Sequence, residues 1–189
     1  MRKKRVFSWL LVGILACSLA ITLSLGTANS VQAQALATTN SALTLSGGLN
    51  LQAYCQSQGF GPATTVNNTY YGWRCILGTG YVTFSMQAAC QWQYQRNDMW
   101  DTTPNFYSPT GGQCWQGQNL GGINLRAYCQ SHGFNDVTLL GSTVYDWYCT
   151  LGTGYVTVNW DNACSWMYNR SAKFRFADFY TATSGQCIG

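Results

Sequence analysis

The pattern of apolar and polar residues divides the chain into an N-terminal segment and a longer remainder. Four basic residues at positions 2–5 come first, and the segment from Val6 to Leu25 then carries no charge and is mostly apolar. Small residues follow in the run Val31-Gln32-Ala33-Gln34-Ala35. This order is typical of a secretory signal, and it predicts a signal peptide at residues 1–35 that is cleaved after Ala33 or Ala35.

Two other interpretations of this segment stay open. The apolar run is about as long as a membrane span requires, so an uncleaved anchor is one alternative. The run Ile14-Leu15-Ala16-Cys17 resembles a lipid-attachment box, although the apolar stretch continues past Cys17 and encloses it. Residues 36–46 are uncharged and rich in Ala, Thr, Ser and Leu, and they are predicted to form a linker.

The remainder of the chain contains an internal duplication, which predicts two structural units. Gly47–Cys90 aligns without gaps on Gly121–Cys164, at an offset of 74 residues. After one deletion the offset becomes 73, so that Gly112-Gln113-Cys114 meets Gly185-Gln186-Cys187. We therefore expect two Cys-rich modules in tandem, at residues 47–116 and 117–189, that abut because their connection is short.

The first part of each repeat predicts a helix followed by a strand. Asn50 and Gly59 are the start and stop signals of a short helix over residues 51–58. Apolar residues then alternate, which predicts a strand that is buried on one side. That side consists of Tyr71, Trp73, Cys75 and Leu77 in the first repeat and of Tyr145, Trp147, Cys149 and Leu151 in the second.

The second part predicts a hairpin, another helix and a loop. Gly78-Thr79-Gly80 is typical of a tight hairpin turn, and the return strand directs Tyr81 and Thr83 outward. Ser85, or Asn159 in the second repeat, begins a helix that we expect to continue through Arg96 or Arg170. A loop tethered by the last cysteine follows. The predicted fold class is therefore α+β, with each module ordered as helix, antiparallel strands, helix and Cys-tethered tail.

Charge excludes one class of partner. The chain has ten Lys and Arg, six Asp and no Glu, and its formal net charge is +4. Because residues 2–5 hold four of the ten cations, the remaining six balance the six aspartates. A nucleic-acid partner requires a basic surface that this balance does not supply. We expect membrane contact only through the signal segment, if it is retained.

The cysteines predict disulfides. Eight of the nine recur in the repeats, as Cys55, Cys75, Cys90 and Cys114, and as Cys129, Cys149, Cys164 and Cys187. An even number in an exported chain indicates four disulfides. The four cysteines of each repeat can pair in three ways. We favour the pairing of the first with the second and of the third with the fourth. A module of this size buries little apolar surface, and each disulfide adds roughly 2–4 kcal/mol. A zinc site is not favoured, because no Cys-x-x-Cys pair occurs.

Catalytic residues are not evident in the sequence. None of the six aspartates meets a carboxylate at the aligned position of the other repeat, whereas acid–base hydrolysis normally needs a pair. Asp98 and Asp101 are the only close pair, and we expect both to be solvated loop residues. The single histidine, His132, is expected on an exposed helix face. The sequence therefore predicts no enzyme, no metal and no cofactor.

Aromatic and amide side chains are the shared chemistry that remains. Nine aromatic positions align between the repeats, more than a small module can bury, so some rings should be exposed beside neutral polar groups. Such a surface suits neutral, hydroxyl-rich ligands. Arg96 and Arg170 are the only aligned charges, predicted to stack on the Trp one helical turn earlier or to bind ligand with it. The candidate ligand-binding residues are Gln56, Ser57, Tyr81, Thr83, Trp92, Arg96 and Gln113, with Gln130, Ser131, Tyr155, Thr157, Trp166, Arg170 and Gln186 as their counterparts.

One resemblance supports the expected compartment. The runs Tyr54-Cys55, Trp73-Arg74-Cys75 and Ala89-Cys90-Gln91-Trp92-Gln93-Tyr94 resemble uncharacterised cysteine-rich tandem-repeat modules of exported soil-bacterial proteins, and the likeness implies no activity. We therefore expect a secreted or cell-envelope, lectin-like protein with two binding sites for neutral glycans or cell-wall polymers. A structural, interaction or inhibitor-like envelope protein that binds other proteins is the alternative, and an unidentified hydrolase is the third.

Overall fold

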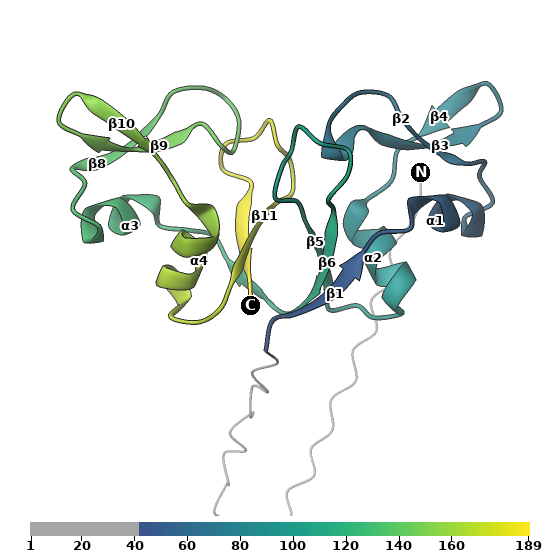
Figure 1. Cartoon of the computed structure of the whole chain (residues 1–189), viewed down its shortest axis with the longest axis horizontal. Helices are drawn as coiled ribbons and strands as arrows, with labels where there is room; N and C mark the ends of the chain where they lie inside the picture. The colour runs from purple at the N-terminus through teal and green to yellow at the C-terminus, as the bar shows by residue number, and fades with distance from the viewer. Residues whose placement is uncertain (1–41) are drawn as a thin grey trace, which may run out of the picture. The chain divides into compact units, whose positions relative to one another are not determined.

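The computed structural model describes residues 42–189. The predicted signal peptide, its cleavage positions, Cys17 and residues 36–41 of the predicted linker lie outside this range. Within it the chain is an α+β protein with four short helices and four small antiparallel sheets (Figure 1). The helices are α1 (Leu51–Ser57), α2 (Met86–Tyr94), α3 (Leu125–Ser131) and α4 (Trp160–Tyr168), and a 3-10 turn, η1 (Tyr70–Gly72), precedes the third strand.

Each sheet has three strands, in the orders β1-β6-β5, β2-β3-β4, β10-β9-β8 and β11-β12-β7. In both repeats one sheet is a simple meander, and the other is completed by the strand that precedes the first helix. The strands are β1 (Thr44–Gly48), β2 (Ala63–Thr65), β3 (Trp73–Leu77), β4 (Gly80–Val82), β5 (Met99–Thr102), β6 (Gln113–Gln116), β7 (Asn119–Gly121), β8 (Asp136–Leu139), β9 (Trp147–Leu151), β10 (Gly154–Thr157), β11 (Lys173–Phe176) and β12 (Gly185–Ile188).

The helices begin where the capping residues predict. Asn50 Oδ1 accepts a hydrogen bond from the Ala53 amide at 3.0 Å, and Ser85 Oγ accepts one from the Ala88 amide at 3.2 Å. Asn124 and Asn159 cap α3 and α4 in the same way. These bonds satisfy amides that have no partner inside the helix.

The second helix of each repeat ends earlier than the sequence predicts. Gln95 adopts left-handed backbone angles (φ 52°), as does Asn169 after α4 (φ 49°), so the arginine that follows lies outside the helix. The prediction that Arg96 stacks on Trp92 one turn away is therefore wrong. Arg96 instead pairs with Asp98, with Nε–Oδ1 at 2.8 Å. A left-handed glutamine is uncommon, so the sequence carried no stop signal there.

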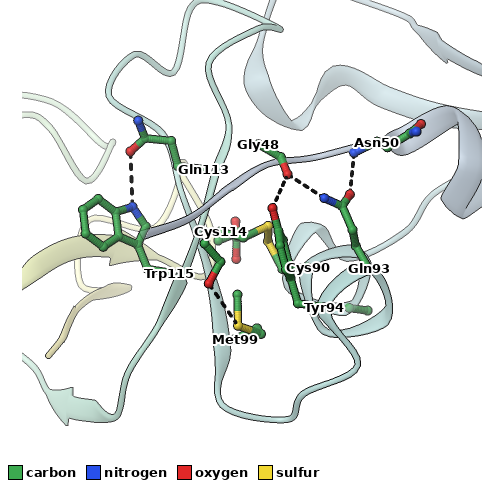
Figure 2. Close-up of a disulfide and its surroundings, with 12 residues drawn as sticks. Gly48, Asn50, Cys90, Gln93, Tyr94, Met99, Gln113, Cys114 and Trp115 are labelled. Atoms are coloured by element: carbon green, nitrogen blue, oxygen red, sulfur yellow. Dashed lines mark hydrogen bonds between the residues drawn. A yellow bond between two sulfur atoms is a disulfide. The ribbon is translucent and has the colours of Figure 1, made fainter. Parts of the chain in front are cut away.

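The end of the predicted linker belongs to a sheet. Thr44–Gly48 forms β1 and pairs with β6, so residues 44–46 are strand rather than linker. The Tyr94 hydroxyl and the Gln93 amide of α2 both donate to the Gly48 carbonyl, at 3.1 and 2.8 Å (Figure 2). Gly47 has a φ of +140°, and an added Cβ would lie 2.6 Å from the Tyr94 hydroxyl. Only glycine fits this contact, which explains its alignment with Gly121.

The predicted buried side of the hairpin strand is only partly correct. Cys75 and Cys149 are buried, but Leu77 and Leu151 at the strand ends are each 54% exposed. Both leucines are the last residues of their strands and lie next to the hairpin turn. The alternating pattern therefore identified the strand but not the extent of its buried face.

The four disulfides pair neighbouring cysteines, as favoured from the sequence. They are Cys55–Cys75, Cys90–Cys114, Cys129–Cys149 and Cys164–Cys187, with sequence separations of 20, 24, 20 and 23 residues. Each one ties a helix to a strand, as Figure 2 shows for Cys90 of α2 and Cys114 of β6. All eight sulfurs belong to residues that are no more than 1% exposed.

Four buried disulfides indicate an oxidising environment such as the extracellular space. Among residues 42–189, no helix combines the length and the apolar character that crossing a membrane demands.

Equivalent residues of the two repeats meet at an aromatic junction. The rings of Phe106 and Phe179 stack with centroids 3.4 Å apart and planes 6° from parallel. Each phenylalanine carbonyl accepts a backbone hydrogen bond from its own repeat, from the Tyr70 amide at 2.7 Å and the Val144 amide at 2.9 Å. Tyr71 and Phe176 add a ring contact across the junction at 5.4 Å. The two repeats thus bury aligned aromatic residues against each other.

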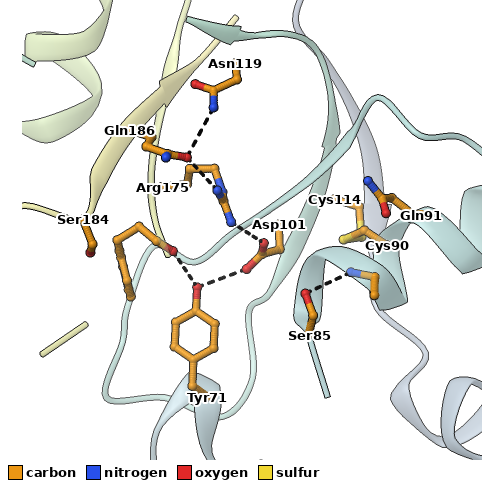
Figure 3. Close-up of polar contacts among 12 residues, drawn as sticks. Tyr71, Ser85, Cys90, Gln91, Asp101, Cys114, Asn119, Arg175, Ser184 and Gln186 are labelled. Carbon is orange, nitrogen blue, oxygen red and sulfur yellow. Dashed lines mark hydrogen bonds and ion pairs between the residues drawn. A yellow bond between two sulfur atoms is a disulfide. The ribbon is translucent and has the colours of Figure 1, made fainter. Parts of the chain in front are cut away.

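A buried ion pair joins the repeats beside these rings. Asp101 is 2% and Arg175 is 8% exposed, and Arg175 Nη2 lies 3.3 Å from Asp101 Oδ1 (Figure 3). The Tyr71 hydroxyl lies 3.1 Å from Asp101 Oδ2 and 3.2 Å from the Phe176 carbonyl oxygen. The prediction that Asp101 is a solvated loop residue is wrong. The sequence does not reveal this, because the partner is 74 residues away.

Candidate ligand-binding sites

The candidate residues on the hairpins and the first helices are exposed, as the sequence predicts. Tyr81 is 62% and Tyr155 is 58% exposed, and Thr83 and Thr157 also face solvent. The other exposed candidates, all on α1 or α3, are Gln56, Ser57, Gln130 and Ser131. The Ser57 and Ser131 hydroxyls donate to the helix carbonyls of Tyr54 and Tyr128. That these residues bind a ligand stays a prediction.

Trp92 and Trp166 pack against the first helix of their repeat. The Trp92 ring contacts Tyr54 edge-on at 5.7 Å, and the Trp166 ring contacts Tyr128 at 5.8 Å. Trp166 is 39% exposed and also lies 6.2 Å from the ring of His132, which is on the surface as predicted. Neither tryptophan stacks on a cation; the cation–π contacts of the described residues join Lys173 to Trp115 and Arg175 to Trp100.

The two tail glutamines are engaged in internal hydrogen bonds. Gln113 Oε1 accepts from the Trp115 indole at 3.2 Å. Gln186 Oε1 accepts from Arg175 Nη1 at 2.9 Å and therefore supports the buried ion pair. We expected exposed amides at these positions, and both side chains are half-buried instead. They are held by neighbours that the sequence pattern does not place beside them.

Two cavities occupy equivalent places in the two repeats, and no candidate residue lines either one. Their volumes are about 640 Å³ in the first repeat and about 420 Å³ in the second. Ten lining positions of the first cavity align with lining positions of the second, and six of these ten carry the same residue. The ten are Gly48, Leu49, Asn50, Leu51, Gln52, Ala63, Trp73, Pro109, Thr110 and Gly112, with Gly122, Ile123, Asn124, Leu125, Arg126, Val137, Trp147, Ala182, Thr183 and Gly185 as counterparts.

A tryptophan joins each cavity to the loop that covers it. Trp73 Nε1 donates to the Pro109 carbonyl at 2.7 Å, and Trp147 Nε1 donates to the Ala182 carbonyl at 2.9 Å. Pro109 and Ala182 are themselves lining residues. The indole of each repeat therefore holds the loop between the last two strands in place as one wall of the cavity.

The first cavity is lined by apolar and neutral polar groups. Trp73, Leu49, Leu51 and Ala63 give it an apolar surface, and none of its lining residues is charged. Asn50 Oδ1 is used by the helix cap and Gln52 Oε1 accepts from the Ala63 amide. Their side-chain NH₂ groups have no acceptor among residues 42–189. The rim thus offers hydrogen-bond donors without net charge.

Tyr70 lies at the inner wall of the first cavity. It is 1% exposed, and its hydroxyl has no hydrogen-bond partner in the described part of the chain. Burial raises its pKa, so the hydroxyl keeps its proton. Gly112 packs against the ring so closely that an added Cβ would collide with it. The aligned residue of the second repeat is Val144, which has no polar atom.

The second cavity is smaller and has a charged rim. Val137 replaces Ala63, and Trp160 enters the lining from α4. Trp160 is held by Phe174, with ring centroids 4.4 Å apart. Arg126 replaces Gln52, and its Nε lies 2.9 Å from Asp136 Oδ1. The positive charge of Arg126 at the rim is therefore balanced by the carboxylate of Asp136.

The sequence does not predict these cavities, although residues that line both of them align between the repeats. Asn50, Thr110 and Gly112 align between the repeats, but the sequence predicts only a helix cap for the first and a loop for the others. The sequence predicts Trp73 on the buried side of a strand, whereas its side chain is half-buried and lines the cavity. The missing information was the position of the loop, which a disulfide and the Trp73 hydrogen bond determine.

No metal site accompanies the cavities in the described residues, where no three His, Cys, Asp or Glu side chains gather closely enough to hold an ion. Comparison of the chain with protein-family models, curated proteins and solved structures found no match.

Proposed function

We propose that the protein is an exported, non-catalytic binding protein with two tandem modules, residues 47–116 and 117–189, and that the cavity of each module binds neutral glycans. Residues 1–35 would direct export as a signal peptide. The alignment of ten lining positions between the two cavities, six of them with the same residue, carries this proposal. A site that both modules possess is the simplest basis for a function that both perform.

The chemistry of the cavities favours an uncharged ligand that has one apolar face. Binding cavities are typically a few hundred Å³ in volume, mainly apolar, and contain a few directional polar groups. An indole packs well against the C–H face of a sugar ring, while Asn50, Gln52 and Thr110 supply neutral hydrogen-bonding groups. No lining carboxylate or histidine of the first cavity is available for acid–base chemistry, which supports a binding role over a hydrolytic one.

One observation favours the second candidate function, the binding of a protein partner. The hairpin turns carry the same residues in both repeats, Leu-Gly-Thr-Gly-Tyr-Val-Thr, from Leu77 and from Leu151. The leucines and the tyrosines of these turns are more than half exposed. Exposed apolar residues often mark interaction surfaces. A pull-down from the producing cell's wall fraction would separate a protein partner from a glycan.

Filling a cavity is expected to remove binding without unfolding the protein. Ala63→Phe places a ring in the first cavity, and Val137→Phe does so in the second. On a neutral-glycan array, each single variant should lose about half of the sites, and the double variant should bind roughly tenfold more weakly or not at all. Thr65→Leu is the matched control. Thr65 is exposed, and the aligned residue of the second repeat, Leu139, is already an exposed leucine.

The array distinguishes three outcomes. Wild-type binding that the double variant loses supports the proposal. A wild-type array without any signal contradicts glycan binding. Binding that persists in Ala63→Phe with Val137→Phe, while circular dichroism shows an intact fold, contradicts the placement of the sites in the cavities.

A further inference from the structure

We infer that one extended glycan chain occupies both cavities and crosses the junction between the repeats over Tyr107 and Tyr180; this rests on the proposed function. These two tyrosines are the most exposed Phe, Tyr or Trp side chains of residues 42–189, at 70% and 68%. They occupy aligned positions, and neither belongs to the residues proposed above. Exposed rings that cluster at aligned positions are candidates for contact with a ligand.

The two tyrosines flank the aromatic junction. Tyr107 contacts Phe106 edge-on at 5.2 Å and Phe179 at 5.9 Å, and Tyr180 contacts Phe179 at 5.1 Å and Phe106 at 6.3 Å. Each tyrosine thus touches the phenylalanine of the opposite repeat as well as its own. The four rings form one continuous aromatic cluster, and its two tyrosines face solvent. A ligand that contacts this cluster contacts both repeats.

The backbone holds both tyrosines in the same way. The Tyr107 amide donates to Asn105 Oδ1 and the Tyr180 amide donates to Asp178 Oδ1, each at 3.0 Å. The rings are therefore presented by fixed turns rather than by free side chains of a loose loop. Tyr and Trp side chains that are fixed before binding give large contact areas at low entropic cost.

The loops that carry the tyrosines are also the cavity walls. Residues 103–112 connect β5 to β6, and this loop supplies Tyr107 and the lining residue Thr110. Residues 177–184 connect β11 to β12 and supply Tyr180 and the lining residue Thr183. Tyrosine and threonine are three positions apart in each loop, so at most about 10 Å of chain lies between them. The cavities and the junction therefore belong to one connected surface.

The junction is itself hollowed beside one tyrosine. A cavity of about 310 Å³ lies between the repeats, lined by Tyr180, Phe106 and Phe179 together with Asn67 and Thr69. Arg74 and Asp178 also line it and place one charge of each sign beside the aromatic rings. A polymer that spans both module cavities would cover this hollow, whereas two separate small ligands would leave it empty.

The test is the dependence of affinity on chain length. Isothermal titration uses the glycan that binds best on the array, as a disaccharide, a tetrasaccharide and an octasaccharide. The expected result is an octasaccharide affinity at least about tenfold above that of the disaccharide, with one chain bound per protein, because the second contact is intramolecular. Tyr107→Ser with Tyr180→Ser should remove most of this gain and leave disaccharide affinity unchanged.

Leu77→Ser with Leu151→Ser is the matched control, since these aligned residues are exposed to a similar degree and lie on the hairpins. It should retain the gain with length. Equal affinities for all lengths in the wild type, with two chains bound per protein, would overturn the inference and leave the proposed function intact. A gain that survives the tyrosine substitutions would overturn it as well. No binding of any length overturns both.

Discussion

Reduction of the disulfides is expected to unfold the protein at room temperature. Each disulfide closes a loop of 20 to 24 residues, and opening a loop of this size costs about 3 kcal/mol in the chain-entropy description. The four together contribute about 12 kcal/mol, which is comparable to the 5–15 kcal/mol by which a domain is typically stable. The measurement is urea unfolding followed by circular dichroism, with and without a phosphine reductant.

Removing one disulfide at a time by mutation distinguishes the loss of the bonds from a general effect of the reductant. Replacing Cys90 and Cys114 together with serine should lower the free energy of unfolding by about 3 kcal/mol. The pair Cys164 and Cys187 should give a similar loss, because the bonded partners and burial are equivalent. A reduced protein with an unchanged urea midpoint would show that the apolar clusters are sufficient and that the disulfides are dispensable.

Arg175→Met is expected to destabilise the protein by about 3–5 kcal/mol at neutral pH, because it leaves the Asp101 carboxylate buried without its counter-charge. Burial raises the pKa of Asp101, and Arg175 and the Tyr71 hydroxyl oppose that rise. Removing Arg175 raises this pKa further. Since the native variant then holds a proton that the unfolded chain has released, acidification from pH 7 towards pH 4 should recover part of the lost stability.

Two controls define the origin of that loss. Arg175→Met combined with Asp101→Leu replaces the whole pair by apolar side chains and should be markedly more stable than Arg175→Met alone. Arg96→Met breaks the exposed pair with Asp98 and should change stability little. Equal losses for Arg96→Met and Arg175→Met, or a loss that does not depend on pH, would contradict the role of the buried pair.

The sequence predicts what is local and what is repeated. Capping residues such as Asn50 and Ser85 located the starts of the helices, and the disulfides pair neighbours in order. The sequence does not reveal the end of α2 because Gln is not a typical stop residue, whereas Asn169, which ends α4 in the same left-handed geometry, is one. The same limit applies to β1, whose partner strand lies about 70 residues further along the chain.

Long-range contacts account for the errors in the site. Asp101 was expected in solvent and is buried because it meets Arg175 of the other repeat. Gln186 was expected to be free for ligand and supports that same arginine. Comparison of the repeats identified shared residues correctly, but it could not separate an exposed shared ring from one that forms a cavity wall. That distinction requires the loops at residues 103–112 and 177–184 in place.

The indole resonances of Trp73 and Trp147 report whether a glycan occupies the two cavities. Each Nε1–H donates to a loop carbonyl at a cavity wall, whereas Trp100 Nε1 donates to Gly117 away from both cavities. Two-dimensional ¹H–¹⁵N spectra during titration with the best glycan should show saturable shifts of both cavity indoles and an unchanged Trp100 signal. Binding that leaves the Trp73 and Trp147 signals in place would contradict the account.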